Sequence, residues 1–110
     1  MKLIDAVKER LAPLKLVEWG PESEPPALPS VAYDAHDDGV VIILVVGQDQ
    51  WHTDQAAGAI FRLLNGWLPP RDIPKLRVAM TESGPDYPEN IHSMQWYTLL
   101  RVEPKHFLSA

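Results

Sequence analysis

The sequence has 110 residues, of which 45% are hydrophobic, and this predicts one globular domain spanning residues 1–110. It contains no cysteine, which excludes a disulfide framework and thiolate metal sites. The formal net charge of −5 argues against nucleic-acid binding, because phosphates require a basic surface. Asp5 interrupts the apolar run that a signal peptide needs, and the longest apolar stretch, 40–46, is too short to span a bilayer. We therefore expect a soluble intracellular protein.

Charges are segregated along the chain. No Lys or Arg occurs between Lys15 and Arg62, a stretch that instead holds the acids Glu18, Glu22, Glu24, Asp34, Asp37, Asp38, Asp49 and Asp54. The stretch from Arg62 to Arg77 also contains Arg71 and Lys75, against Asp72 as its one acid. Solubility explains any single charge, but this segregation predicts an acidic side and a smaller basic side, which favour association between unlike patches.

The first elements are an amphipathic helix and a short strand. Apolar residues recur at helical spacing from Leu3 to Ala12, and Pro13 ends this helix. A short strand is expected within 15–19. Four prolines make the following segment, 20–29, an extended loop.

A hairpin should follow the proline-rich loop. Alternating apolar residues over 31–35 predict a half-buried strand, and Asp37-Asp38-Gly39 predicts a turn. The continuous apolar run Val40–Val46 is typical of a central strand that is buried on both faces.

A second helix is predicted over Thr53–Asn65, with Thr53 or Asp49 as its N-cap and Gly66 as a left-handed stop. Its Ile60, Leu63 and Leu64 side chains should pack on the Val40–Val46 strand.

Two further strands complete the sheet. They are predicted over 76–81 and 94–102, with a loop at 84–90 between them. Tyr97 and Leu99 make the outer face of the last strand unusually apolar. The fold class that follows is α+β, in the order α-β-β-β-α-β-β. We expect a two-layer sandwich, in which two helices cover a mixed four- to five-stranded sheet.

Two groups of histidine and aspartate side chains are candidates for chemistry. Asp34, His36 and Asp38 have the spacing of one strand face and could hold a metal, but Asp and Gly are also the residues expected in a turn. His52 and Asp54 flank a helix start, where a capping cluster is the commoner arrangement. We therefore expect no metal, no cofactor and no catalytic residues.

With its elements in this order, the chain resembles the bacteriophage tail terminator proteins, a tail-completion (minor capsid) family. The stretches that carry the resemblance are 1–14, 40–47 leading into 54–60, and 84–87 before the last strand. The resemblance implies a non-enzymatic virion protein, assembled in the bacterial host cytoplasm as a hexameric ring. Such a ring would cap the tail tube, contact the head–tail connector, and let DNA pass through its lumen without specific binding.

A ring requires two different patches on each subunit, and the segregated charges supply such a pair. We expect acids of one subunit to lie near bases of the next, with apolar anchors on the last strand. The candidate interface residues are Asp34, Asp37, Asp38, Arg71, Lys75, Arg77, Tyr97 and Leu99. The alternative is a small intracellular protein-binding module, such as an immunity protein or a secretion chaperone, which would be a monomer or dimer. An enzyme using the histidine–aspartate groups ranks third.

Overall fold

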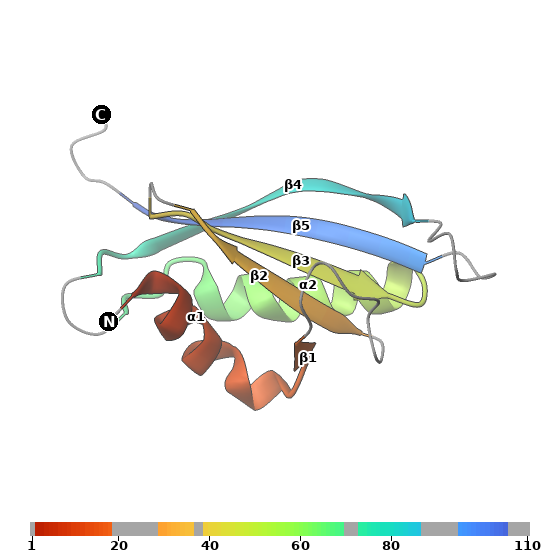
Figure 1. The fold of residues 1–110 in the computed structure, drawn as a ribbon, viewed down its shortest axis with the longest axis horizontal. Helices are drawn as coiled ribbons and strands as arrows, with labels where there is room; N and C mark the ends of the chain where they lie inside the picture. Colours follow the sequence, from red (N-terminus) through yellow and green to blue (C-terminus); the bar gives the residue numbers. More distant parts are fainter. Residues whose placement is uncertain (1, 19–28, 37–38, 70–72, 87–94, 106–110) are drawn as a thin grey trace.

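The computed structural model describes residues 2–18, 29–36, 39–69, 73–86 and 95–105. These residues form two α-helices, a short 3-10 helix and five strands (Figure 1). In chain order the elements are α1 (Leu3–Leu11), η1 (Ala12–Leu14), β1 (Val17–Glu18), β2 (Ser30–Ala35), β3 (Val41–Gly47), α2 (Gln50–Leu64), β4 (Leu76–Asp86) and β5 (Gln95–Pro104). The predicted α+β class and element order are confirmed. No helix in the described part of the chain is both long and apolar enough to cross a membrane.

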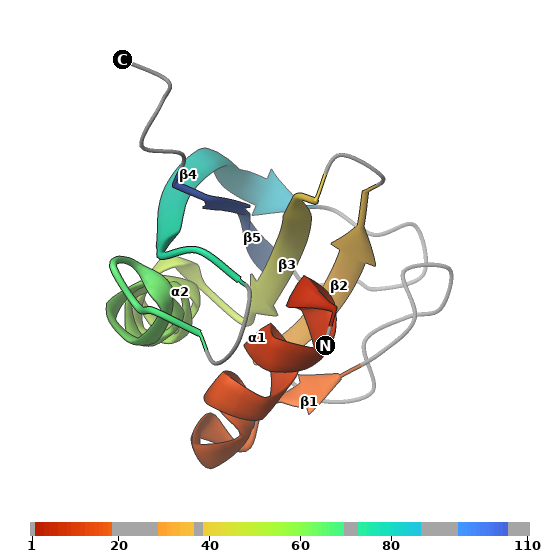
Figure 2. The same cartoon turned by 90° about the vertical axis from the view of Figure 1, so that its left-hand side faces the viewer.

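The strands form one sheet in the order β1-β2-β3-β5-β4. β1 pairs with β2 in parallel, and every other neighbouring pair is antiparallel. β5 therefore returns between β3 and β4, while α2 crosses over from β3 to β4. Both α-helices cover the same face of the sheet (Figure 2). The two-layer sandwich is thus confirmed, with β3 in the interior of the sheet as its apolar run predicts.

The main hydrophobic core lies between this sheet and the helices. Ile43, Ile60, Leu64 and Leu100 are each 0% exposed and belong to one cluster. The predicted packing of α2 on β3 is confirmed, although Leu63 is only partly buried at the margin of the cluster. At about 25 cal/mol per Å² of apolar surface removed from water, this burial is the main stabilising contribution that the fold displays.

The prediction that the β3 run is buried on both faces is confirmed only in part. Val41, Ile43 and Val45 are buried, and Val46 is buried on the other face, but Ile42 and Leu44 on that other face are only partly covered. The physical reason is that both α-helices of the described residues lie on one side of the sheet. A continuous apolar run cannot distinguish burial on two faces from an apolar face left open.

The helix α2 begins at Gln50 rather than at Thr53. Asp49 is the N-cap, since its carboxylate accepts the backbone N–H of His52 at 2.8 Å. The Thr53 hydroxyl instead lies 2.8 Å from the backbone oxygen of Asp49 and 3.1 Å from that of Trp96, which share its one proton, and this ties the first turn of the helix to β5. At the other end Gly66 has φ +78°, so the predicted left-handed stop is confirmed.

The turn after α2 covers the first part of the outer edge of β4. Leu76 donates its N–H to the oxygen of Trp67 at 2.9 Å and accepts the N–H of Gly66 at 2.8 Å. The N–H of Val78 is satisfied by the Asn65 side chain at 3.1 Å. These contacts use backbone groups that an edge strand would otherwise offer to another chain.

The remainder of β4 differs from its prediction. The strand runs on to Asp86, so Gly84, Pro85 and Asp86 belong to it rather than to a loop, while 87–90 lie outside the described residues. Proline is tolerated here because β4 is an edge strand. A register shift between Met80 and Glu82 interrupts the ladder.

Candidate interaction surface

The sheet face opposite the helices carries a second, smaller hydrophobic cluster. Ala32 and Val46 are buried in it, and Leu44 and Tyr97 pack against them. The register places Leu44 between Ala32 of β2 and Leu99 of β5, so apolar side chains form a row across the sheet. The predicted apolar outer face at Tyr97 and Leu99 is confirmed. It is joined by Ala32 of β2 and by β3 residues from the run that was predicted to be buried on both faces.

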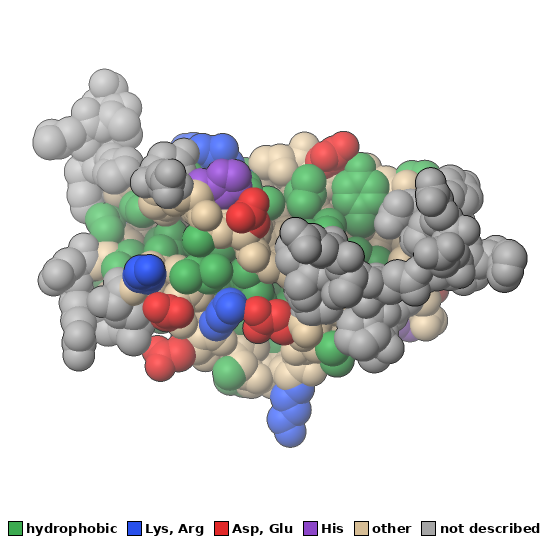
Figure 3. Space-filling view, viewed as in Figure 1, with side chains coloured by type: hydrophobic (Ala, Val, Ile, Leu, Met, Phe, Trp, Pro, Cys, Tyr) green, Lys and Arg blue, Asp and Glu red, His purple; other side chains and the backbone are tan. Residues whose placement is uncertain are grey.

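This face is hollowed by a shallow groove of about 190 Å³, which we call the open-face groove. Its lining residues are Ala32, Tyr33, Asp34, Ile42, Leu44 and Leu99. Figure 3 shows hydrophobic side chains gathered along the sheet, with acidic and basic side chains at their margins. Asp34 is the charged residue in the lining, and its side chain is 68% exposed. An apolar groove with a carboxylate at its rim is complementary to a partner surface on which an apolar side chain lies next to a positively charged one.

The sheet order separates the acidic and basic segments of the sequence. β1 and β2 form one edge of the sheet and β4 forms the other. Glu18 and Asp34 therefore lie toward one edge, whereas Arg77 is on β4 at the opposite edge and Lys75 immediately precedes that strand. The remaining charged candidates, Asp37, Asp38 and Arg71, lie outside the described residues.

Arg77 is engaged within its own chain. Its guanidinium donates to Glu103 at 2.6 Å, and the Arg101 guanidinium donates to the other oxygen of that carboxylate at 3.2 Å. These hydrogen bonds hold the pKa of Glu103 below its ordinary value, and the bond from Arg77 makes the larger contribution. The Tyr97 hydroxyl likewise donates to Glu82 at 2.9 Å. Of the two basic interface candidates that the structure describes, Lys75 is therefore better placed than Arg77 to contact a neighbouring subunit.

The histidine–aspartate candidates form a capping cluster. The His52 ring nitrogen Nδ1 lies 2.8 Å from the carboxylate of Asp49, so the acid that contacts His52 is the N-cap residue itself. The hydrogen bond from the backbone N–H of His52 lowers the pKa of Asp49, and the hydrogen bond with the His52 side chain makes a smaller contribution in the same direction. This arrangement stabilises the start of α2, because a carboxylate there meets unpaired N–H groups.

The suggested metal ligands are only partly described. His36 lies 3.2 Å from Asp34 on the exposed end of β2, and Asp38 is outside the described residues. Within the described part of the chain, no group of three His, Asp or Glu side chains is arranged to hold a metal ion.

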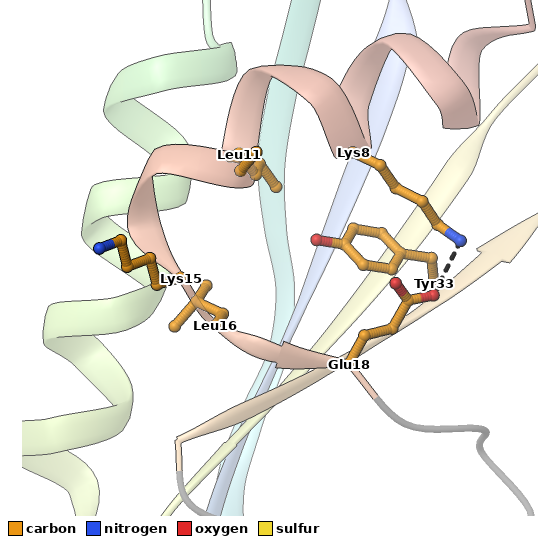
Figure 4. Close-up of a pocket in the computed structure, with 7 residues that line it drawn as sticks. Lys8, Leu11, Lys15, Leu16, Glu18 and Tyr33 are labelled. Atoms are coloured by element: carbon orange, nitrogen blue, oxygen red, sulfur yellow. Dashed lines mark ion pairs between the residues drawn. The ribbon is translucent and has the colours of Figure 1, made fainter.

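A small polar pocket of about 160 Å³ lies between α1 and the β1–β2 edge (Figure 4). The Lys8 ammonium forms an ion pair with Glu18 at 2.8 Å and lies 5.3 Å from the centre of the Tyr33 ring. These contacts link α1 to both edge strands. Burial, with a smaller contribution from Glu18, raises the pKa of Tyr33 to about 12. The residues around this pocket therefore hold α1 against the edge of the sheet. Burial in the fold also disfavours ionisation of the Tyr33 hydroxyl.

We expect the free energy of unfolding to fall as the pH rises from 10 to 12, because tyrosine in the unfolded chain ionises first, near 10, while Tyr33 in the fold stays neutral until about 12. Below pH 10 both states are protonated and this contribution is fully present. Allowing for the partial exposure of the ring, the loss should be about 1–2 kcal/mol. Urea titrations of the wild type and Tyr33→Phe across this range isolate the effect from lysine titration. The same pH dependence in both proteins would contradict it.

These features describe a small α+β protein with a helix-covered core and an open, apolar sheet face, with Glu18 and Asp34 toward one edge of the sheet and Lys75 beside the other. No protein-family model matches the sequence, and a search of curated proteins gives no match. The fold is similar to that of a chain in a solved structure described as "Virion of native gene transfer agent (GTA) particle", with a TM-score of 0.59 and 19% sequence identity. The similarity covers 92% of this chain and 92% of that chain.

Proposed function

We propose that this protein is a structural, non-enzymatic component of a phage-like particle. The observation that supports this most is the fold similarity to a chain of a gene transfer agent virion, which extends over 92% of both chains. Coverage of this extent means that the similarity extends over most of the fold rather than over one common motif. The open apolar sheet face adds to the argument, because an assembled protein buries such a surface against neighbours.

Within that class, the role we propose is that of a tail terminator. The protein would form a homohexameric ring that caps the tail tube and joins it to the head–tail connector, with DNA passing through the lumen without specific binding. The unlike sheet edges support this arrangement. A head-to-tail contact uses two different patches, and each subunit carries acids toward its β1–β2 edge and Lys75 beside its β4 edge. Tyr97 and Leu99 contribute apolar contact area on the open face.

A small protein-binding module is the second candidate, since the open-face groove would serve it equally well. The two functions differ in assembly state. A binding module is a monomer or dimer that meets an unrelated partner, whereas a terminator forms closed rings and is a stoichiometric part of a particle.

The expected result is a ring of uniform size, seen by electron microscopy of the purified protein or of particles that contain it. Because the contact is partly between unlike charges, raising the salt concentration should reduce the assembled fraction in mass measurements. Each exposed ion pair contributes only about 0–1 kcal/mol, so salt should weaken the ring without abolishing it. A strict monomer or dimer, both alone and in particles, would contradict the terminator role and favour the binding module.

A further inference from the structure

The turn that follows α2 presents an apolar side chain to solvent. Leu68 is 67% exposed, although the neighbouring Trp67 packs against the main core and bonds to the edge of β4. A basic side chain lies beside this turn. The Cε of Lys75 is 3.9 Å from the position that a Cβ on Gly66 would occupy. The turn therefore combines an exposed leucine with an adjacent ammonium group.

The open-face groove has the complementary character. Its floor is formed by the apolar side chains of Ile42, Leu44 and Leu99, and Asp34 stands at its rim. Its volume of about 190 Å³ is sufficient for a leucine side chain, because enclosed protein cavities of about 150 Å³ can bind benzene. Asp34 is opposite Ile42 in the sheet register, so an occupant of the groove lies within reach of the carboxylate.

We propose that Leu68 of one copy of this protein inserts into the open-face groove of the next copy, where Lys75 meets Asp34. This inference rests on the proposed ring and specifies the contact between its neighbouring subunits. One chain cannot make the contact with itself, because the turn lies at the β4 edge beside the helices and the groove opens on the opposite face. An apolar side chain that fits a pocket elsewhere on the same molecule produces head-to-tail association, which closes into a ring where the rotation permits.

Charge selects Leu68 over Trp51 and Met80, the other large hydrophobic side chains of the described residues that are more than half exposed. Trp51 is 64% exposed, but it stands on the first turn of α2 next to the acids Asp49 and Asp54. Met80 is 55% exposed and lies on β4 close to Glu82. Either would bring a negative charge toward the acidic rim of the groove. Docking of Leu68 would instead place the Lys75 ammonium near the Asp34 carboxylate, and these opposite charges attract each other.

The absence of native cysteine makes disulfide trapping a direct test. The single variants Leu68→Cys and Ile42→Cys are purified, mixed at high concentration and oxidised. Because a disulfide requires Cα atoms within about 7 Å of each other, the proposal predicts that the mixed dimer is the main product. Trp51→Cys mixed with Ile42→Cys is the matched control and should give little mixed dimer. Adding Lys75→Glu to the Leu68→Cys variant should slow mixed-dimer formation by up to about fivefold, while Lys15→Glu should not.

The outcomes separate the contact from the function. Mixed dimers no more abundant than in the Trp51 control, with both variants folded by circular dichroism, would overturn the proposed contact even if electron microscopy shows rings. A double variant carrying Leu68→Cys and Ile42→Cys on one chain should form a ladder of covalent oligomers that ends at the closed ring. A ladder without an end supports the contact and indicates open filaments, which would contradict the terminator role instead.

Discussion

Truncating Leu100 to alanine should lower the free energy of unfolding by about 2–5 kcal/mol, a large share of the total for a domain of this size. Leu100 is 0% exposed on β5 and belongs to the main core with Ile60 and Leu64 of α2. Removing its terminal carbons loses their transfer free energy and leaves a cavity that the helix can fill only in part. Equilibrium unfolding in urea, followed by circular dichroism, measures the change.

The adjacent residue is the matched control. Leu99 points to the open-face groove and is only partly buried, so Leu99→Ala should cost about 1 kcal/mol of folding stability. Under the proposed assembly it should nevertheless weaken association more than it weakens the fold. Equal destabilisation by Leu99→Ala and Leu100→Ala would show that the open face is covered within the chain, and would remove the basis for docking there.

Substitution of Gly47 by alanine should destabilise the fold by about 1–3 kcal/mol or more, the usual cost of overpacking. A Cβ at this position would lie 3.0 Å from the Thr53 nitrogen and 3.1 Å from its Cα, and it would overlap the Thr53 hydroxyl. That hydroxyl joins the first turn of α2 to β5, so displacing it also loses its hydrogen bonds. Thermal unfolding should show a markedly lower Tm.

Gly58→Ala provides the contrasting glycine. Gly58 lies within α2, and the contact there is with the flexible end of Arg62 at 3.4 Å. Alanine should therefore raise stability by about 0.5–1 kcal/mol, since glycine is the poorer helix former. The double variant Gly47→Ala/Thr53→Ala should recover part of the loss by removing the worst overlap. If Gly47→Ala unfolds at the wild-type temperature, the close approach of β3 to α2 is wrong.

The sequence by itself determined the features that depend on a few neighbouring residues. The apolar period of α1, the left-handed stop at Gly66 and the alternation around Tyr97 all follow from local backbone geometry. The element order followed as well, and with it the fold class. The start of α2 was misplaced because Thr53 and Asp49 are both acceptable caps, and only the geometry of the turn selects between them.

Other features arise where distant segments meet, and only the tertiary structure decided them. The local pattern of Val41–Gly47 is the same whether a second layer covers its outer face or leaves it open. The insertion of β5 between β3 and β4 leaves Glu18 and Asp34 toward one edge of the sheet and Lys75 beside the other, which no local window encodes. The groove and the exposed Leu68 likewise depend on strand pairing and helix docking. Strand pairing and helix docking depend on contacts between residues far apart in the sequence, and the local periodicity of the chain does not encode those contacts.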